Sequence, residues 1–303
     1  MLAEKGDKAD IENPERDEQR KLDGTRALPI KNGNKIVLRG RSWINDYASN
    51  FPEIVAELRK LPVEACVLDG ELTFFKKGTE KDVFMSALVK PETRKDYDVK
   101  MMLFDVLYVE DNDVRQLPFS DRREILEELV PKGLKHIEVV KTVTGKGKQG
   151  YFDELKKKEG EGVILKEKQS PYQEGERTRE WLRVKNWKSD EAVIVGYTQG
   201  EGARANTFGA VILAQKDKNG KWRYVGKTSG FKDSDTRNLL TKMQKLKSSK
   251  PVIDLPSGVT VKEWVNPKIV AEVKYYEKTP DHIFRFPDFL RERTDKTPEE
   301  CKL

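Results

Sequence analysis

The pattern of hydrophobic and polar positions changes about two thirds of the way along the 303 residues. Up to residue 188, apolar runs that predict strands alternate with segments that predict amphipathic helices. Residues 27–40 contain two such runs around Asn32-Gly33, which is a strong hairpin signal. Further strands are predicted at residues 66–75, as a buried pair, and at 99–109 and 163–166, with helices at 52–59, 121–130 and 151–158. Residues 12–20 contain no apolar side chain, and their pattern predicts no element.

After residue 189 the apolar runs become short and Gly-rich turns separate them. Strands are predicted at residues 192–198, 208–215, 222–228 and 269–279, with one helix at 233–247. Several short strands with a single helix are typical of a small β-barrel of the oligonucleotide-binding type, the OB-fold. We therefore expect an α+β protein of two domains: residues 1–188, with antiparallel sheets and flanking helices, and a barrel at residues 189–303.

Composition narrows the classes of function. No apolar run approaches the ~20 residues of a membrane span. Cys66 and Cys301 lack metal-binding spacing, and two histidines make zinc chemistry or a Ser-His-Asp triad poor explanations. The net charge is +6, and residues 177–188 and 216–250 combine Lys and Arg with aromatic residues, a pattern that favours a nucleic-acid partner. We expect a cytoplasmic protein that does not associate with membranes.

Residues 21–26 (KLDGTR) carry the most informative chemistry. A lysine amine is protonated at neutral pH and becomes a nucleophile when burial or nearby cations lower its pKa. Gly24 allows a tight turn beside Lys21, and Arg26 can clamp phosphate or sugar oxygens. The alternative is a solvated turn, because the chain holds 58 basic and 52 acidic residues.

Four acidic residues lie on or beside apolar strands, where a carboxylate is costly unless it is paired or binds a metal. They are Asp23, Glu71, Asp105 and Glu161. Glu71 and Glu161 each adjoin a glycine, which we expect to leave room for a ligand, and two carboxylates can hold Mg²⁺. The alternative for each is a strand-end acid in water.

Cations and an aromatic residue complete the candidate site. Arg183 and Lys185 are two residues apart and share one side of a predicted strand, so both can point at one ligand. The alternative is an exposed basic edge strand. Phe104 can stack on a base or belong to the core.

These residues form an ordered series of motifs. They are KLDGTR (21–26), Arg41, DGE (69–71), FDVL (104–107), EGVILK (161–166), WLRVK (181–185) and RTDK (293–296). The series resembles the covalent nucleotidyltransferase superfamily of ATP-dependent DNA ligases, RNA ligases and mRNA capping enzymes. Residues 170–172, 195–197, 208–210, 224–226 and 285–287 extend the resemblance to the ligase module of prokaryotic end-joining DNA ligases.

The resemblance implies a role for each motif. Lys21 would attack the α-phosphate of ATP to form lysyl-AMP, with Asp23 in the same catalytic motif. Gln19, Leu22, Arg26, Arg41 and Phe104 would bind the nucleotide, with Phe104 stacked on adenine and the arginines on ribose and phosphate. Glu71 and Glu161 would serve the metal, and Lys166, Arg183 and Lys185 would neutralise phosphate charge. Arg293, Asp295 and Lys296 would orient the leaving pyrophosphate.

Two positions depart from the family pattern. Gln19 stands where the family usually has a Glu that reads the adenine amino group, and Arg183 stands where it usually has Lys.

The function we expect is ATP-dependent sealing of nicked or broken duplex DNA. ATP is the expected AMP donor with Mg²⁺, and Mn²⁺ is an expected substitute. We also expect a monomer that works in repair or end joining with an end-binding or clamp protein. The alternatives are an RNA ligase, a capping-type guanylyltransferase, and a non-catalytic nucleic-acid-binding protein on the same scaffold.

Overall fold

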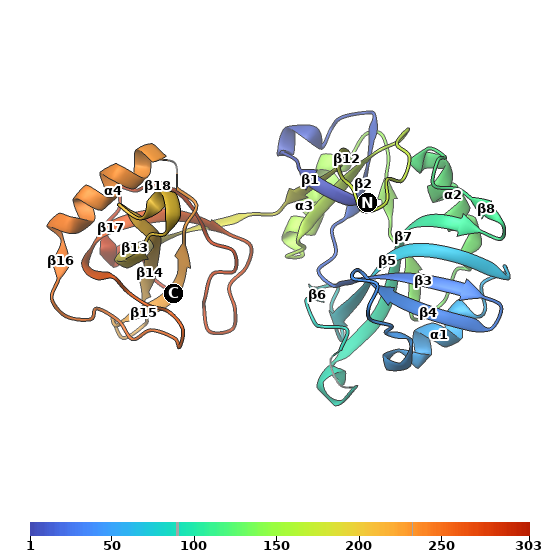
Figure 1. Ribbon diagram of the computed structural model, residues 1–303, viewed down its shortest axis with the longest axis horizontal. Coiled ribbons are helices and arrows are strands. Elements are labelled where there is room, and N and C mark those ends of the chain that lie inside the picture. The colour runs from blue at the N-terminus through green and yellow to red at the C-terminus, as the bar shows by residue number, and fades with distance from the viewer. Residues whose placement is uncertain (89–90, 232) are drawn as a thin grey trace. The chain divides into compact units, whose positions relative to one another are not determined.

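The computed structural model describes residues 1–88, 91–231 and 233–303. The chain divides into two compact units, Met1–Asn186 and Trp187–Leu303, and the boundary expected from the sequence lies two residues beyond this division. Sheets dominate both units and helices are few, which confirms the expected α+β class (Figure 1). Short 3-10 helices lie at Lys8–Asp10, Ala48–Asn50, Pro91–Arg94, Gly202–Arg204 and Pro298–Glu300.

The first unit contains a five-stranded sheet in the order β1-β12-β11-β2-β10. Its strands are β1 (Leu2–Lys5), β2 (Arg16–Arg20), β10 (Thr142–Val143), β11 (Gly162–Glu167) and β12 (Arg177–Lys185). The pair β1 and β12 is parallel, and the other neighbours are antiparallel. Helix α3 (Lys148–Lys157) covers one face, where Phe152 and Leu155 pack on Val163 and Leu165.

The second sheet of this unit has seven strands, with a main path β4-β3-β5-β7-β8. The strands are β3 (Thr25–Asn32), β4 (Lys35–Gly40), β5 (Ala65–Lys76), β6 (Asp82–Val83), β7 (Tyr97–Val109), β8 (Asn112–Asp113) and β9 (Ile137–Val139). Helices α1 (Pro52–Leu58) and α2 (Phe119–Leu129) pack on one face of the sheet. The hairpin predicted at residues 27–40 is therefore confirmed as β3 and β4.

The prediction of a buried strand pair at residues 66–75 is wrong, because these residues form part of one strand, β5. Its register against β7 shifts between Asp69 and Gly70. A Cβ atom at Gly70 would lie 2.6 Å from the carbonyl oxygen of Met102. Gly70 thus permits β5 and β7 to approach each other closely.

The two-residue period of β7 gives the seven-stranded sheet two different faces. Met101 and Leu103 enter the core under α1 and α2. Met102 and Phe104 point to the opposite face, where they join Leu22, from the turn after β2, and Val140, from the segment between β9 and β10. The free faces of the two sheets therefore face each other.

Strand β2 lies in the segment for which the pattern predicted no element, and its polar side chains are buried. Asp17 pairs with Arg123 of α2 at 3.0 Å. Glu18 is fully buried on the α3 side, and neither carboxyl oxygen has a hydrogen-bond partner among the described residues. Burial raises the pKa of Glu18 to about 8, although Lys148 opposes the shift.

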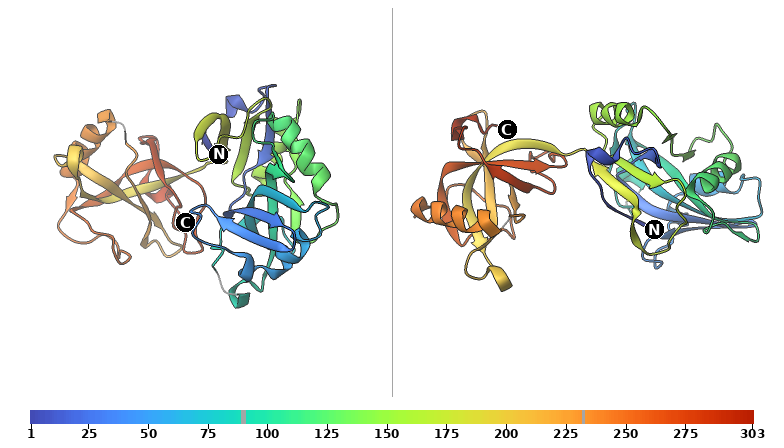
Figure 2. Two further views of the ribbon diagram at one scale, coloured as in Figure 1. Left: turned by 45° about the vertical axis from the view of Figure 1, so that its right-hand side comes forward. Right: turned by 90° about the horizontal axis from the view of Figure 1, so that it is seen from above.

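The second unit is a single antiparallel sheet that curves round its own core (Figure 2). Its path is β15-β14-β13-β17-β16, and β18 also pairs with β17. The strands are β13 (Lys188–Gln199), β14 (Phe208–Lys216), β15 (Trp222–Thr228), β16 (Lys247–Ser248), β17 (Glu263–Tyr275) and β18 (Asp288–Glu292). The predicted helix is α4 (Asp233–Lys245), and it ends before residue 247 because Lys247 pairs with Val265 of β17.

Within the described residues, no helix has the length and apolar character needed to cross a membrane.

Replacing Glu18 with Gln should alter how thermal stability depends on pH. The carboxyl titrates near its ordinary 4.5 when unfolded and at about 8 when folded, so its stabilising contribution is complete below 4.5 and is lost as pH rises to about 8. In calorimetry of the ligand-free protein, the Tm of the unsubstituted chain should fall across this window relative to Glu18→Gln. The exposed Glu124→Gln is the matched control. Parallel curves for the unsubstituted protein and Glu18→Gln would contradict the burial argument.

Candidate active site

A cavity of about 270 Å³ lies between the two sheets of the first unit. From the five-stranded sheet and the turn after β2 it is lined by Met1, Leu2, Ala3, Gln19, Arg20, Lys21, Leu22, Ile164, Lys166, Arg177, Trp181 and Arg183. From the seven-stranded sheet and its loops it is lined by Arg26, Arg41, Glu71 and Phe104. The structure thus brings most of the residues selected from the sequence to one cavity.

Lys21 is held at the edge of this cavity by its neighbours on β11. Its backbone N–H donates to the carbonyl of Gly162 at 2.9 Å, and its Nζ lies 2.5 Å from Oε2 of Glu161. The other oxygen of Glu161 lies 3.0 Å from Nζ of Lys185. One nearly buried carboxylate therefore bridges Lys21, which follows β2, and Lys185 of β12.

The glycines beside the acidic residues do not leave room for a ligand, contrary to the expectation from sequence. Gly162 has φ +135°, and a Cβ there would lie 2.1 Å from the carbonyl oxygen of Val184. A Cβ at Gly70, which adjoins Glu71, would lie 2.6 Å from the carbonyl oxygen of Met102. Both glycines therefore allow neighbouring strands to approach each other closely. Gly24 does the same beside Lys21, because a Cβ there would lie 2.3 Å from the carbonyl oxygen of Leu72.

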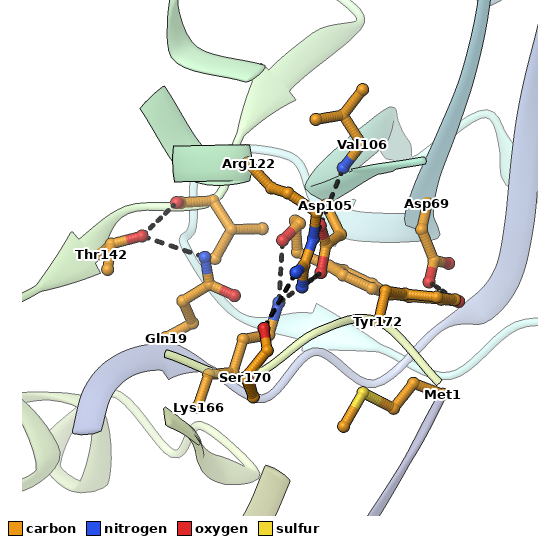
Figure 3. Close-up of polar contacts among 12 residues, drawn as sticks. Met1, Gln19, Asp69, Asp105, Val106, Arg122, Thr142, Lys166, Ser170 and Tyr172 are labelled. Carbon is orange, nitrogen blue, oxygen red and sulfur yellow. Dashed lines mark hydrogen bonds and ion pairs between the residues drawn. The ribbon is translucent and has the colours of Figure 1, made fainter. Parts of the chain in front are cut away.

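Arg26 lines the cavity with its guanidinium bound to Asp69. Nε and Nη2 donate to the two carboxylate oxygens at 2.9 and 2.5 Å. The hydroxyl of Tyr172 donates to the same carboxylate at 2.7 Å (Figure 3). Burial and the Asp69 charge raise the pKa of Tyr172, so this hydroxyl stays protonated. The network fixes Arg26 beside the ring of Phe104, whose centre is 5.6 Å away.

Glu71 stands next to Arg26 across the β3–β5 pair. Burial raises its pKa to about 8; Lys21 and Arg26 oppose this shift, and the charges of Asp69 and Glu161 add to it. A divalent cation would relieve the repulsion between Glu71 and Glu161, so this pair fits the chemistry of a magnesium site. No group of three or more His, Cys, Asp or Glu residues suited to a metal occurs within the described part of the chain.

Lys166 lines the cavity, but its side chain is almost completely buried. Its Nζ donates to the carbonyl of Phe104 at 2.8 Å and is 4.0, 4.5 and 4.7 Å from the ring centres of Trp181, Phe119 and Phe104. Burial lowers its pKa to about 7, although Asp105, 4.0 Å away, opposes the shift. In this structure the amine of Lys166 supports the wall that carries Phe104.

Asp105 is a core residue and does not line the cavity. Arg122 of α2 donates to its two oxygens at 2.8 and 3.1 Å, and both side chains are fully buried. Arg122 also donates to the carbonyl of Ser170 at 2.9 Å, so the pair joins β7, α2 and the loop after β11 (Figure 3). The carboxylate of Asp105 is thus stabilised by pairing with a cation, as a buried acid requires.

Gln19 lines the cavity from β2 and is hydrogen-bonded to β10. Its Nε2 donates to the hydroxyl of Thr142 at 2.9 Å, as Figure 3 shows. On the same side of the sheet, Ile164 lies between Gln19 and Arg183 across the paired strands.

Other selected residues lie outside the cavity lining. The backbone N–H of Asp23 donates to Asp82 at 2.9 Å. Arg293, Asp295 and Lys296 belong to the second unit, where Arg293 binds Asp295 at 2.7 and 2.8 Å and Glu191 at 2.6 Å. They form a cluster of their own in that unit.

Sequence reasoning assigned no role to several cavity residues: Met1, Leu2, Ala3, Arg20, Ile164, Arg177 and Trp181. A signal existed for Trp181, because Trp181, Arg183 and Lys185 are two residues apart along β12 and share one face. No comparable signal existed for β1, which reaches the cavity by pairing with β12.

Comparisons with known proteins agree with this architecture. The family described as "ATP dependent DNA ligase domain" matches residues 1–185, and "ATP dependent DNA ligase C terminal region" matches residues 204–296. A DNA ligase of Thermococcus fumicolans is 32% identical over 93% of this chain and 52% of its own length. The multifunctional non-homologous end joining protein LigD of Mycolicibacterium smegmatis is 30% identical over 99% of this chain and 39% of its own length.

A solved structure extends the agreement to three dimensions. The ligase domain of LigD from M. tuberculosis is 28% identical, with a TM-score of 0.56, over 99% of this chain and 96% of that one. The two units are thus a nucleotidyltransferase domain and a C-terminal OB-fold domain, as the sequence predicted. The chain belongs to the ATP-dependent DNA ligase family. It spans about half the length of the first curated relatives it matches.

Replacing Asp105 with Ala should lower the free energy of unfolding of the first unit by about 3–5 kcal/mol, because it leaves Arg122 buried without a counter-charge. Urea unfolding followed by circular dichroism would measure the change. Asp113→Ala, which removes an exposed partner of Arg115, is the matched control and should change stability little. Equal stability of the two variants would contradict a structural role for the Asp105–Arg122 pair.

Proposed function

We propose that this chain is an ATP-dependent DNA ligase that joins 5′-phosphate and 3′-hydroxyl ends in duplex DNA. The observation that carries the proposal is the position of Lys21, which lines the cavity between the two sheets while its amine is bound to Glu161. The family membership of the chain supports the choice of ATP and of DNA.

In the first step, Nζ of Lys21 attacks the α-phosphorus of ATP. A nitrogen–phosphorus bond forms, the bond to the β-phosphate oxygen breaks, and pyrophosphate leaves. The amine must lose a proton before it attacks, and Glu161 at 2.5 Å is within reach to accept it. Arg183 and Lys185 offset the negative charge that develops on the phosphate.

The cavity wall supplies the groups that would hold the nucleoside. Phe104 offers a ring for the adenine, and Leu22 lies in the same apolar cluster. Gln19, held by Thr142, would meet the base. Arg26 and Arg41 would contact ribose and phosphate, with Arg26 already oriented by Asp69.

Glu71 and Glu161 are the carboxylates that would hold Mg²⁺, with Mn²⁺ as a substitute. Mg²⁺ usually binds through one or two carboxylates together with phosphate oxygens and water, so two carboxylates suffice. A bound ion would shield phosphate charge from the attacking amine.

The OB-fold domain would contribute Arg293, Asp295 and Lys296 to the first step, where they would orient pyrophosphate. The salt bridge from Arg293 to Asp295 already presents a fixed guanidinium in that domain. Domain closure for adenylylation and opening for DNA binding would gate the reaction.

In the second step AMP passes from Lys21 to the 5′-phosphate at a break, which frees the lysine. In the third step the 3′-hydroxyl attacks that phosphate, the new phosphodiester bond forms, and AMP leaves. The net positive charge of the chain suits a duplex substrate.

For the biological role we propose DNA repair by end joining, because relatives that match nearly the whole chain are named for non-homologous end joining. An end-binding or clamp protein would then deliver the broken DNA to a ligase monomer. A cytoplasmic location fits this role and the two unpaired cysteines.

The alternatives use different nucleotides or no covalent step. A capping-type enzyme would take GTP, an RNA ligase would join RNA ends, and a non-catalytic scaffold would take no nucleotide onto Lys21. The described barrel strands that match the ligase C-terminal region favour the DNA ligase.

Replacing Lys21 with Ala should abolish covalent labelling of the protein by α-³²P-ATP, because it removes the attacking nitrogen. Label that survives denaturing electrophoresis measures the step. Lys35→Ala, which removes an exposed lysine at the end of β4, is the matched control and should label normally. Covalent label on the Lys21→Ala protein would refute Lys21 as the nucleophile. Labelling of the unsubstituted protein by GTP but not by ATP would favour a capping-type enzyme.

A further inference from the structure

The segment that carries Lys21 is held from the side of the seven-stranded sheet by one carboxylate of β6. Asp82 has a side chain that is 2% exposed, and its Oδ1 lies 2.5 Å from Nη2 of Arg20. Its Oδ2 accepts the backbone N–H of Asp23 at 2.9 Å. Arg20 and Asp23 stand on the two sides of Lys21, so a single side chain binds the guanidinium before Lys21 and the backbone after it.

Neighbouring contacts show that this is a continuous brace between the two segments. Nη2 of Arg20 also donates to the carbonyl of Glu80 at 2.9 Å. The hydroxyl of Thr25 donates to the carbonyl of Met85 at 3.3 Å. The guanidinium of Arg20 lies 5.8 Å from the ring centre of Phe75, which is the partner of Asp82 across the strand pair. Arg20 is thereby confined between an aromatic ring and a buried carboxylate.

Lys21 depends on such a brace because regular strand structure ends at Arg20 and resumes at Thr25. On the side of the five-stranded sheet, its backbone N–H is bound to Gly162 of β11. On the opposite sheet, Asp82 holds the residues on either side. The position of Nζ relative to the cavity therefore depends on both anchors.

We propose that Asp82 is a positioning residue for Lys21, acting through Arg20 and the backbone of Asp23. The proposal rests on the adenylylation chemistry proposed above. Asp82 does not line the cavity, so its effect on the reaction is indirect. It belongs to β6, in the connection between β5 and β7, where no residue was selected for the site.

This role affects one step of the reaction more than the others. Lysyl-AMP formation needs Nζ of Lys21 in line with the α-phosphorus, and a misplacement of about 1 Å can slow such a step about a hundredfold. Sealing a nick that already carries AMP does not use that nitrogen as the attacking atom. ATP binding depends on Phe104, Arg26 and Gln19, which Asp82 does not contact.

The test uses the full chain with Asp82→Ala and Asp82→Asn. Single-turnover labelling by α-³²P-ATP over a range of ATP concentrations gives the maximal rate of adenylylation and the half-saturating ATP concentration. For Asp82→Ala the maximal rate should fall about tenfold to a hundredfold, while the half-saturating concentration and the sealing of a pre-adenylylated nick stay near those of the unsubstituted protein.

Asp82→Asn should fall between Asp82→Ala and the unsubstituted protein. Its amide oxygen can still accept the N–H of Asp23, but it leaves Arg20 without a counter-charge. The matched control is Lys81→Ala, which removes the neighbouring ion pair between Lys81 and Glu159 and should leave every rate unchanged.

Three results would overturn the inference. Adenylylation by Asp82→Ala as fast as by the unsubstituted protein would show that Asp82 does not position Lys21. Equal losses in adenylylation and in sealing of the pre-adenylylated nick would show a general structural role. An unsubstituted protein that takes no label from ATP would contradict the proposed function itself, and with it the step that Asp82 is inferred to serve.

Discussion

The hydrogen-bonded pairing of β2 with β11 is the constraint on which the candidate site depends. It places the backbone of Lys21 against Gly162, and hence the amine of Lys21 against the carboxylate of Glu161. The next strand, β12, adds Lys185 to the other oxygen of that carboxylate. The pairing requires Gly162, because any side chain there would collide with β12. A one-residue slip of β2 would turn Lys21 to the other face of the sheet.

The two sheets contribute different chemistry to the cavity between them. The five-stranded sheet and the turn after β2 bring the amine of Lys21 and the guanidinium of Arg183, and the seven-stranded sheet brings Phe104 and the acid Glu71. Two polar pairs hold the seven-stranded sheet's side of the cavity in place: Arg26 with Asp69, and Asp105 with Arg122. Breaking such a pair leaves a buried charge uncompensated, which ties the geometry of the site to the stability of the domain.

The sequence predicts much of this arrangement where local pattern decides the outcome. The hairpin of β3 and β4 and the strand β15 follow from alternation and spacing. The grouping of the motifs at one cavity follows from their resemblance to the covalent nucleotidyltransferase superfamily. It does not predict β2, because Asp17 and Glu18 become buried through partners more than a hundred residues away. It leaves open which group stabilises Asp105, because the partner Arg122 lies on a helix whose packing the pattern does not reveal.

Sealing of a singly nicked DNA duplex is the most direct test of the central claim, that Lys21 and its cavity serve DNA ligation. The purified chain would be incubated with nicked duplex, Mg²⁺ and either ATP or no nucleotide, and the strands separated on a denaturing gel. The account predicts a strand of joined length that forms with ATP. A chain that labels on Lys21 yet joins no DNA nick, while joining a nicked or broken RNA, would contradict the assignment of its substrate.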